Sequence, residues 1–352
     1  MINCVVEYKN IPHLNQLYTG FKLLHDAQVI NLEFSNRLVH KELKDKSVIR
    51  VVINESIIIY YDTLDGYNWI DAETNENIEY FRNTFKCDYY FKRSFSKTLE
   101  SQSLVKLLPL GLYYNITPYF DIEKLNSIES VKKKLKNNSL FRRLMKVNAN
   151  FFVKDFEHYP DLLIDDKEIR ILFSARLWPP DGAKNEESKL QREAINNFRI
   201  TIVKTLKKEY GERFIGGIST DSYSSSVLEK EFLLPFEFTN RKNYLKLMKS
   251  ASICIATTGI HSSIGGKLTE YVCAARAIIS EPLYYEVPGD FNKNENYLEF
   301  VEVNDLIRNI DYLTKSPEVL KSIMENNRDY YHSYLKPDAL VYNTLNLVLS
   351  NV

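Results

Sequence analysis

Residues 251–280, with the sequence ASICIATTGIHSSIGGKLTEYVCAARAIIS, decide the fold of the second half of the chain. The apolar run that ends at Ile255 and Ala256 is typical of a buried strand, and a second apolar run, AIIS, closes the stretch. Between the two runs, residues 263–275 read as a helix. Buried strands separated by a helix predict a mostly parallel sheet with covered faces.

The start of this helix predicts an anion-binding site. Ser262 or Ser263 is expected to cap the helix. The exposed N–H groups at a helix start and the positive end of the helix dipole suit a diphosphate. The paired glycines Gly265 and Gly266 let a phosphate or a sugar come close to the main chain.

Lys267 and Glu270 extend this candidate site along the helix. Lys267 adds a positive charge, and Glu270, one turn further on, can accept hydrogen bonds from ribose hydroxyls. The preceding loop contributes Thr258, Gly259 and His261 as further binding candidates. A helix start that tolerates glycine, with a solvated lysine and glutamate, is the alternative that the segment alone leaves open.

Strands and helices alternate through both halves of the chain. Apolar strands are predicted at residues 3–8, 27–34, 48–53, 56–62, 87–94, 104–114, 168–176 and 213–219. Helices are predicted near residues 14–24, 73–85, 187–210 and 244–249, and from residue 305 onward. A charged segment from about 121 to 160 separates the two series. Two α/β units predict a cleft between domains, with ligands bound beyond the carboxyl ends of strands.

Composition fits two soluble domains. The chain has 352 residues, and Lys+Arg and Asp+Glu both total 46, so the net charge gives no support for a nucleic-acid partner. The four cysteines are scattered, which favours free thiols in a reducing compartment. The N-terminal residues have no signal-peptide core, and the apolar runs are shorter than a membrane span. We therefore expect a cytoplasmic protein.

Residues 251–280 resemble the nucleotide-sugar-binding stretch of GT-B glycosyltransferases, as found in bacterial surface-polysaccharide enzymes of the group 1 type. The resemblance implies that Glu270 binds the ribose of a UDP- or GDP-linked sugar donor, which is a substrate, and that there is no cofactor. Many retaining members have a second Glu where this chain has Ser262, so retention or inversion stays open.

The segment EIRILFSARLWPPDGAK, residues 168–184, also resembles this family. There a strand, an Arg and a downstream Lys hold the donor phosphates, which implies that role for Arg176 and Lys184. A guanidinium is well matched to a diphosphate because it offers several donors in one plane. Tyr223, after the strand at 213–219, could stack on the base, and Arg241 with Tyr244 begins the next helix.

The resemblance also implies a domain plan. Residues 1–155 form an acceptor domain and residues 156–330 a nucleotide-sugar donor domain, both Rossmann-like α/β/α units. Residues 331–352 form a C-terminal helix that crosses back to the N-terminal domain. The enzyme would move a hexosyl-type sugar to a glycan or lipid-linked acceptor, in synthesis of a capsule, O-antigen or teichoic-acid substituent.

The first half supplies candidates for a catalytic base. His13 lies in the loop after the first strand, and a histidine ionises near neutral pH. Asp62 and Asp65 follow a strand, where a carboxylate could deprotonate the acceptor hydroxyl. Their spacing is not Asp-x-Asp, so no metal is expected. Lys92 and Arg93 lie at another strand end and are candidates to face the cleft.

A basic run and two rival functions complete the expectations. Residues 131–148, VKKKLKNNSLFRRLMKVN, could rest on the inner, anionic face of a membrane, although a solvated helix packed by one apolar side is the alternative. A nucleotide-sugar epimerase on the same fold would need acid and base groups on both sides of the sugar. A two-domain sugar-binding protein is the non-enzymatic rival.

Overall fold

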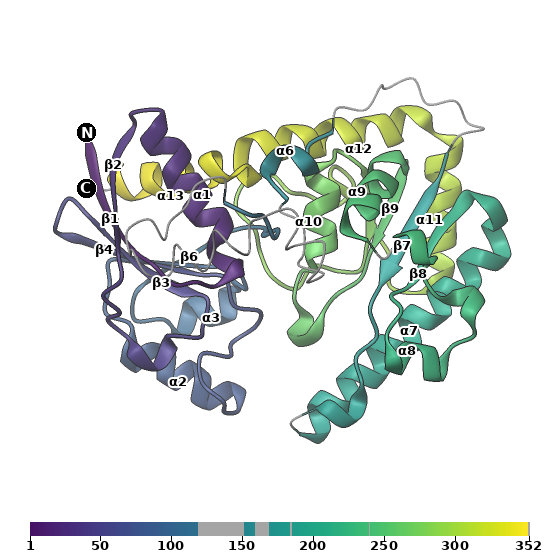
Figure 1. The fold of residues 1–352 in the computed structure, drawn as a ribbon, viewed down its shortest axis with the longest axis horizontal. Helices are drawn as coiled ribbons and strands as arrows, with labels where there is room; N and C mark the ends of the chain where they lie inside the picture. The colour runs from purple at the N-terminus through teal and green to yellow at the C-terminus, as the bar shows by residue number, and fades with distance from the viewer. Residues whose placement is uncertain (119–150, 159–168, 184, 239, 351–352) are drawn as a thin grey trace, which may run out of the picture.

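The computed structural model describes residues 1–118, 151–158, 169–183, 185–238 and 240–350, which form two α/β lobes (Figure 1). The first lobe is built on a six-stranded sheet in the order β2-β1-β3-β4-β5-β6. Its strands are β1 Ile2–Glu7, β2 Ile30–Ser35, β3 Val48–Ile53, β4 Ile57–Asp62, β5 Tyr89–Lys92 and β6 Lys106–Pro109. Its helices are α1 Asn15–Asp26, α2 Thr74–Thr84 and α3 Lys97–Gln102. Each strand predicted in this half overlaps one of these.

Strand β3 departs from the parallel arrangement. It pairs antiparallel with both β1 and β4, whereas the β1–β2, β4–β5 and β5–β6 pairs are parallel. Only residues 54–56 join β3 to β4, and Asn54 (φ 48°) and Glu55 (φ 63°) both take left-handed backbone angles there. Parallel neighbours need a crossover of a dozen residues or more. The short connection therefore forces a hairpin, which the alternation of strands and helices did not indicate.

The second lobe carries a five-stranded sheet in the order β11-β10-β9-β7-β8, and all of its pairs are parallel. Its strands are β7 Ile171–Ala175, β8 Phe214–Ile218, β9 Ile253–Ala256, β10 Ala277–Ser280 and β11 Tyr297–Glu299. Its helices are α6 Val153–Phe156, α7 Glu186–Tyr210, α8 Ser222–Val227, α9 Arg241–Ser250, α10 Gly266–Cys273, α11 Val303–Lys315 and α12 Pro317–Tyr330. This is the α/β domain that residues 251–280 predict.

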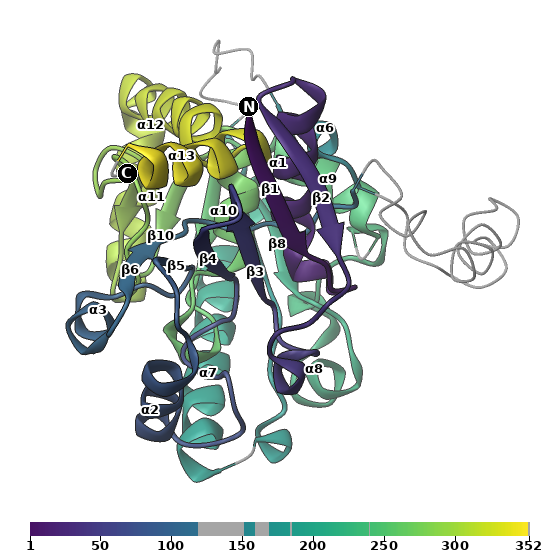
Figure 2. The same cartoon turned by 90° about the vertical axis from the view of Figure 1, so that its left-hand side faces the viewer.

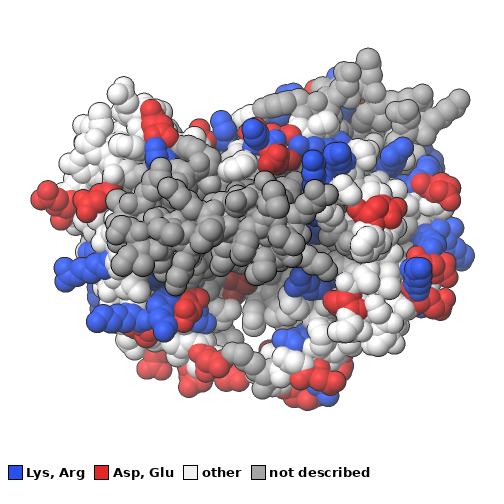
Figure 3. All heavy atoms as spheres, in the orientation of Figure 1, with Lys and Arg blue, Asp and Glu red and all other residues white. Residues whose placement is uncertain are grey.

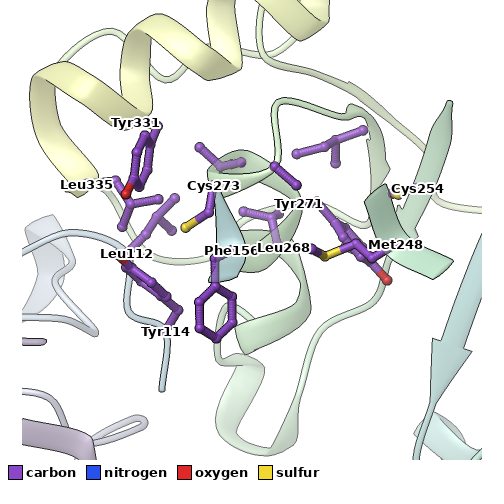
Figure 4. Packing of buried hydrophobic residues seen from close by; sticks show 14 of the residues in the cluster. Leu112, Tyr114, Phe156, Met248, Cys254, Leu268, Tyr271, Cys273, Tyr331 and Leu335 are labelled. Carbon is purple, nitrogen blue, oxygen red and sulfur yellow. The ribbon is translucent and has the colours of Figure 1, made fainter. Parts of the chain in front are cut away.

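Helices cover both faces of the second sheet. Successive residues of β9 belong to different buried clusters, Ile253 with residues of α7 and α11, and Cys254 with residues of α9 and α10. A strand buried on both sides reads as a continuous apolar run, which is why the sequence reveals it. Figure 4 shows the α9–α10 cluster, in which Tyr114 of the first lobe and Tyr331 near the C-terminus also take part. One apolar core therefore links the lobes.

The C-terminal helix returns to the first lobe. After α12, a π-helical turn, Tyr331–Leu335, leads into α13, Pro337–Leu349. Helix α13 lies beside α1 in both ribbon views (Figures 1 and 2) and buries Leu340, Val341 and Leu345 in the core of the first sheet. A Cβ on Gly20 of α1 would lie 2.1 Å from the Pro337 carbonyl oxygen, so glycine permits the close approach. The predicted fold class, including the closing C-terminal helix, is confirmed.

One face of the molecule shows how charge is distributed over the described surface. On the face shown in Figure 3, Lys and Arg side chains are interspersed with Asp and Glu. Among the described residues, no helix combines the length and the apolar character needed to cross a bilayer. The predicted membrane-contact segment 131–148 lies outside the described residues.

Candidate functional site

A cleft of about 800 Å³ lies between the lobes at the carboxyl ends of β7, β8 and β9. Residues that follow these strands line it: Arg176 after β7, Ser219 and Thr220 after β8, and Thr257 after β9. The first residues of α10 line it as well. The cleft thus occupies the edge of the second sheet at which parallel α/β folds bind ligands.

The glycine pair forms the start of α10. Gly265 precedes the helix in an extended conformation (φ −63°, ψ 142°), and Gly266 is its first residue. A Cβ on Gly266 would meet open space, whereas a Cβ on Gly265 would lie 3.2 Å from the Thr257 carbonyl oxygen. The main chain is therefore bare at the cleft, and a ligand can approach it closely.

The expected serine cap is wrong. Among the described residues, no side chain caps α10 with a hydrogen bond. Instead, residues 260–262 form a separate turn in which His261 (φ 60°) and Ser262 (φ 53°) both take left-handed backbone angles. This turn delays the helix start from residue 263 to Gly266. A left-handed conformation at two consecutive non-glycine residues is maintained only where the surrounding structure enforces it. Such backbone strain is common at binding sites.

Lys267 lies on an aromatic ring beside the glycines. Its Nζ is 3.2 Å from the centroid of the Tyr244 ring. Burial lowers the pKa of Lys267 to about 7, against the opposing effect of the Glu270 carboxylate. A bound anion would favour the charged ammonium, so this side chain is suited to a phosphate.

Glu270 is held by an arginine from the neighbouring helix. Arg241 Nη2 lies 2.5 Å from Glu270 Oε1, and Nη1 lies 3.3 Å from Oε2. Both residues line the cleft, and Glu270 is only 6% exposed. The pair fixes the orientation of the carboxylate. Glu270 therefore lines the cleft, as the sequence predicts. Its partner, Arg241, is noted in the sequence only as the first residue of a predicted helix.

Arg176 and Arg199 line the cleft from the same lobe as α10. Arg176 is exposed and its guanidinium lies 5.4 Å from the centroid of the Trp178 ring. Its main-chain oxygen accepts a hydrogen bond of 2.6 Å from Arg199 Nη1, and Arg199 also donates to Thr257 Oγ1 and the Thr258 carbonyl oxygen. Arg199 therefore ties together the loops after β7 and β9. It sits in the middle of α7, where helical periodicity gives no sign of such a role.

Most of the sequence-predicted binding residues come together in this cleft. Those that line it are Arg176, Gly259, His261, Ser263, Gly265, Gly266, Lys267 and Glu270. Thr258 turns away, because its N–H donates to Glu281 at 2.7 Å, and Ser262 lies in the same loop off the lining. Tyr223 is partly buried against the cluster that includes residues of α7 and does not line the cleft, so its stacking on a base stays a prediction. Lys184 lies outside the described residues.

The first lobe contributes three residues to the lining, Asp65, Asn68 and Arg93. Arg93 Nη1 lies 3.0 Å from Asp65 Oδ1, and the Asp65 side chain is 41% exposed. A carboxylate with this exposure at the cleft can reach a ligand. Asp65 thus keeps its candidacy as a base.

Asp62 does not face the cleft, which corrects its place among the catalytic candidates. It is fully buried, and its carboxylate accepts hydrogen bonds from Trp69 Nε1 and Tyr90 Oη at 2.7 Å. Lys92 Nζ at 3.1 Å and the Leu64 N–H at 2.8 Å complete its partners. These bonds occupy the oxygens that a substrate would need, because Asp62 ends β4 on the core side of the strand. Lys92 is buried with it.

His13 lies next to the cleft without lining it. Its ring stacks on Tyr113 with centroids 5.0 Å apart, and the Arg93 guanidinium lies 5.1 Å from the same tyrosine ring. His13 is exposed overall, but partial desolvation of its ring by these neighbours, followed by the positive charge of Arg93, lowers its pKa. The ring is therefore neutral near pH 7, the form in which an imidazole accepts a proton.

The lining is rich in positive charge. Its cations are Arg93, Arg176, Arg199, Arg241 and Lys267, and its carboxylates are Asp65 and Glu270. With Lys267 in its charged form, the lining has an excess of three positive charges beside a bare helix start, which suits a doubly charged diphosphate. Within the described residues, no three His, Cys, Asp or Glu side chains are grouped so as to hold a metal ion.

The fold and the cleft define a class, a two-lobed α/β protein with a cation-rich site at the carboxyl edge of its second sheet. No family model matches the sequence, and no curated protein matches it. Solved structures do resemble the chain. A glycosyltransferase from Rickettsia africae ESF-5 is 14% identical, with a TM-score of 0.39, over 97% of this chain and 96% of that one.

Two further solved structures are also similar to the chain. The C-terminal domain of a glycosyl transferase group 1 family protein from Francisella tularensis is 14% identical, with a TM-score of 0.35, and covers 54% of this chain and 98% of its own. Sucrose-phosphate synthase from Thermosynechococcus elongatus is 13% identical, with a TM-score of 0.37, over 78% of this chain and 76% of its own. Similarity this distant assigns no activity, so we infer function from the cleft itself.

Proposed function

We propose that this protein is a glycosyltransferase that takes a sugar from a nucleoside-diphosphate donor. The observation that carries the proposal is the excess of cations around a bare helix start at the carboxyl edge of the second sheet. A donor diphosphate supplies the negative charge that this lining lacks. The resemblance of residues 251–280 to a nucleotide-sugar-binding stretch points the same way.

In this proposal the second lobe binds the donor. The diphosphate lies against Gly265 and Gly266, between Arg176 and Lys267, and Glu270 accepts hydrogen bonds from the ribose. As the bond to the sugar breaks, negative charge builds up on the leaving diphosphate. Fixed cations stabilise that charge without having to reorganise. We therefore expect transfer to proceed without a metal ion, and chelation by EDTA should leave the rate largely unchanged.

The first lobe binds the acceptor. Asp65 is our first candidate to accept the proton of the acceptor hydroxyl, because its carboxylate lines the cleft and is partly exposed. His13, with a neutral ring close by, is the second. The acceptor is a glycan or a lipid-linked sugar of a surface polysaccharide, and the enzyme works in the cytoplasm or at the inner face of the membrane.

Nucleotide binding tests the proposal. Calorimetric titration with UDP, GDP, ADP and CMP should give measurable affinity for one of them, and Arg176→Ala should weaken it by about 10- to 100-fold, since a hydrogen bond to a charged group contributes about 1.5–3 kcal/mol. Arg308→Ala is a matched control, because Arg308 is 72% exposed on α11.

Three results would count against the proposal. Binding of none of the nucleotides would remove the donor site. Equal affinity of wild type and Arg176→Ala would remove Arg176 from it. Conversion of a free nucleotide-sugar to its epimer without any acceptor would favour the epimerase instead.

A further inference from the structure

Arg93 bridges the two lobes inside the cleft. It follows β5 of the first lobe, and its side chain is 8% exposed. Nη2 donates a hydrogen bond of 2.8 Å to the carbonyl oxygen of Ile264 in the second lobe. Nη1 lies 3.0 Å from Asp65 Oδ1 in its own lobe. One planar guanidinium therefore joins the acceptor-side carboxylate to the other lobe.

The contact in the second lobe lies directly before the glycine pair. Ile264 immediately precedes Gly265, whose extended backbone leads into α10. The Arg93 contact therefore ends one residue before the turn against which we place the donor diphosphate. Next to this contact, a Cβ on Gly66 of the first lobe would lie only 2.7 Å from His261 Cβ. The two lobes are thus in close contact at a second point, between Gly66 and His261.

Buried bonds position the backbone around Asp65 but not its side chain. The Leu64 N–H donates to Asp62 Oδ1 at 2.8 Å, and the Leu64 carbonyl oxygen accepts from Ser94 Oγ at 3.1 Å. The Gly66 N–H donates to Ser94 Oγ at 2.9 Å. Asp65 Oδ1 is buried and has no hydrogen-bond partner among the described residues, so its ion pair with Arg93 Nη1 at 3.0 Å is the contact that directs the carboxylate. Oδ2 is then the oxygen left to meet a ligand.

We propose that Arg93 is a positioning residue that directs the Asp65 carboxylate toward the acceptor while the lobes are in contact through the Ile264 carbonyl. The proposal rests on the proposed function. We place Arg93 outside the donor contacts, because the contacts of its guanidinium are made to Asp65 and to the Ile264 carbonyl oxygen. Its charge and planar geometry allow it to hold one oxygen of the carboxylate and one main-chain oxygen of the other lobe together.

Kinetics of purified full-length variants test this role with the nucleotide-sugar that the wild type uses. Arg93→Ala should lower kcat by about 100-fold, because a misplacement of about 1 Å can cost that much. The donor Kd should change by less than about threefold, since the donor contacts come from the second lobe. Arg93→Lys should recover part of kcat, because an ammonium can keep one of the two contacts. Arg308→Ala is the matched control.

A double-mutant cycle shows whether Arg93 acts through Asp65. The double variant Arg93→Ala/Asp65→Asn should be no slower than Asp65→Asn alone, because the two residues then affect the same step. Losses that multiply would overturn the proposal. So would an unchanged kcat in Asp65→Asn, or a loss of donor affinity in Arg93→Ala at unchanged kcat.

A distance measurement separates this proposal from the proposed function. Spin labels on cysteines introduced by Glu79→Cys and Lys208→Cys, both at exposed positions in different lobes, report how the lobes are held. Arg93→Ala should broaden the interlobe distance distribution, and Arg308→Ala should not. If the wild type neither binds nucleotides nor transfers sugar, the proposed function fails. The interlobe distance distribution still tests whether Arg93 holds the two lobes together. An unchanged distribution in Arg93→Ala would overturn the bridging role.

Discussion

The two lobes line the cleft with different chemistry. The second lobe presents four cations against one carboxylate, Glu270, which is already paired with Arg241. The first lobe presents one cation and one carboxylate, Arg93 and Asp65, which are paired with each other. An unbalanced lining calls for an anion, whereas a balanced one suits a neutral hydroxyl compound. This difference supports the proposed placement of the donor diphosphate in the second lobe and of the acceptor in the first.

The largest expected effect separates two aspartates of the first lobe. Asp62→Ala removes the partner of Lys92 from a site in which both side chains are fully buried. Breaking a buried ion pair by removing one partner costs about 3–5 kcal/mol, because the other charge stays buried. Urea unfolding should show this loss as a lower midpoint.

Asp65→Asn is the matched control for that variant. Asp65 is 41% exposed and keeps its place at the cleft edge, so its free energy of unfolding should change by about 1 kcal/mol or less. Its transfer rate should fall while its stability stays close to that of the wild type. Similar stability losses in the two variants would contradict the distinction between a buried aspartate and one at the cleft.

The second effect concerns how tightly the lobes meet. Gly66 (φ 61°) and Gly211 (φ 50°) both take left-handed angles, but only at Gly66 would a Cβ meet a neighbour, His261, at 2.7 Å. We expect Gly211→Ala to lower the free energy of unfolding by about 1 kcal/mol from backbone strain alone. Gly66→Ala should lower it by about 2 kcal/mol and also weaken nucleotide binding. Equal changes in the free energy of unfolding and in nucleotide affinity for the two variants would show that the contact between Gly66 and His261 contributes to neither.

The strands of both lobes could be predicted because buried strands appear in the sequence as runs of apolar residues. The runs at β7, β9 and β10 are continuous because both faces of the second sheet are covered. The direction of β3 could not be predicted in the same way. It depends on a three-residue connection with two left-handed residues, Asn54 and Glu55, neither of which is glycine. Local composition gives little warning of such a turn.

The second-lobe site was easier to predict than the first-lobe site. Gly265, Gly266, Lys267 and Glu270 are close in sequence, so their proximity follows from one helix start. Arg199 reaches the cleft only through tertiary packing, and helical periodicity carries no such information. A position after a strand likewise does not say which way a side chain points, which is why Asp62 was a candidate although it is buried. A site formed by residues close in sequence can therefore be predicted from the sequence, whereas a site assembled from distant residues cannot.

A third effect tests the bare main chain of the donor side. A Cβ on Gly266 meets open space, so Gly266→Ala should leave the free energy of unfolding unchanged or raise it slightly. The same methyl group would stand where we place the diphosphate, and affinity for the nucleotide should fall about tenfold, or about 1.4 kcal/mol. Calorimetric titration and urea unfolding of the same preparation measure both quantities. Unchanged affinity would move the diphosphate away from this helix start.

The smallest expected effect is a pH dependence confined to the donor side. Burial lowers the pKa of Lys267 to about 7, so the free protein loses this positive charge as the pH rises through neutrality. A bound diphosphate favours the charged form. Affinity should therefore be highest below pH 7 and fall as the pH rises, by about threefold between pH 6.5 and 7.5.

The ligand for this measurement should be a nucleotide-sugar, because its diphosphate is esterified at both ends and does not itself titrate in this range. Lys267→Met removes the titrating group and should bind more weakly, with an affinity that no longer changes between these pH values. The charged neighbours of Lys267 are Glu270, Arg241 and Arg176, and the first two are paired with each other. A dependence that survives in Lys267→Met would assign the proton to another group. An affinity of the wild type that does not change with pH would mean that Lys267 is already fully charged in the empty cleft. The excess positive charge of the second lobe would then be present before the donor binds.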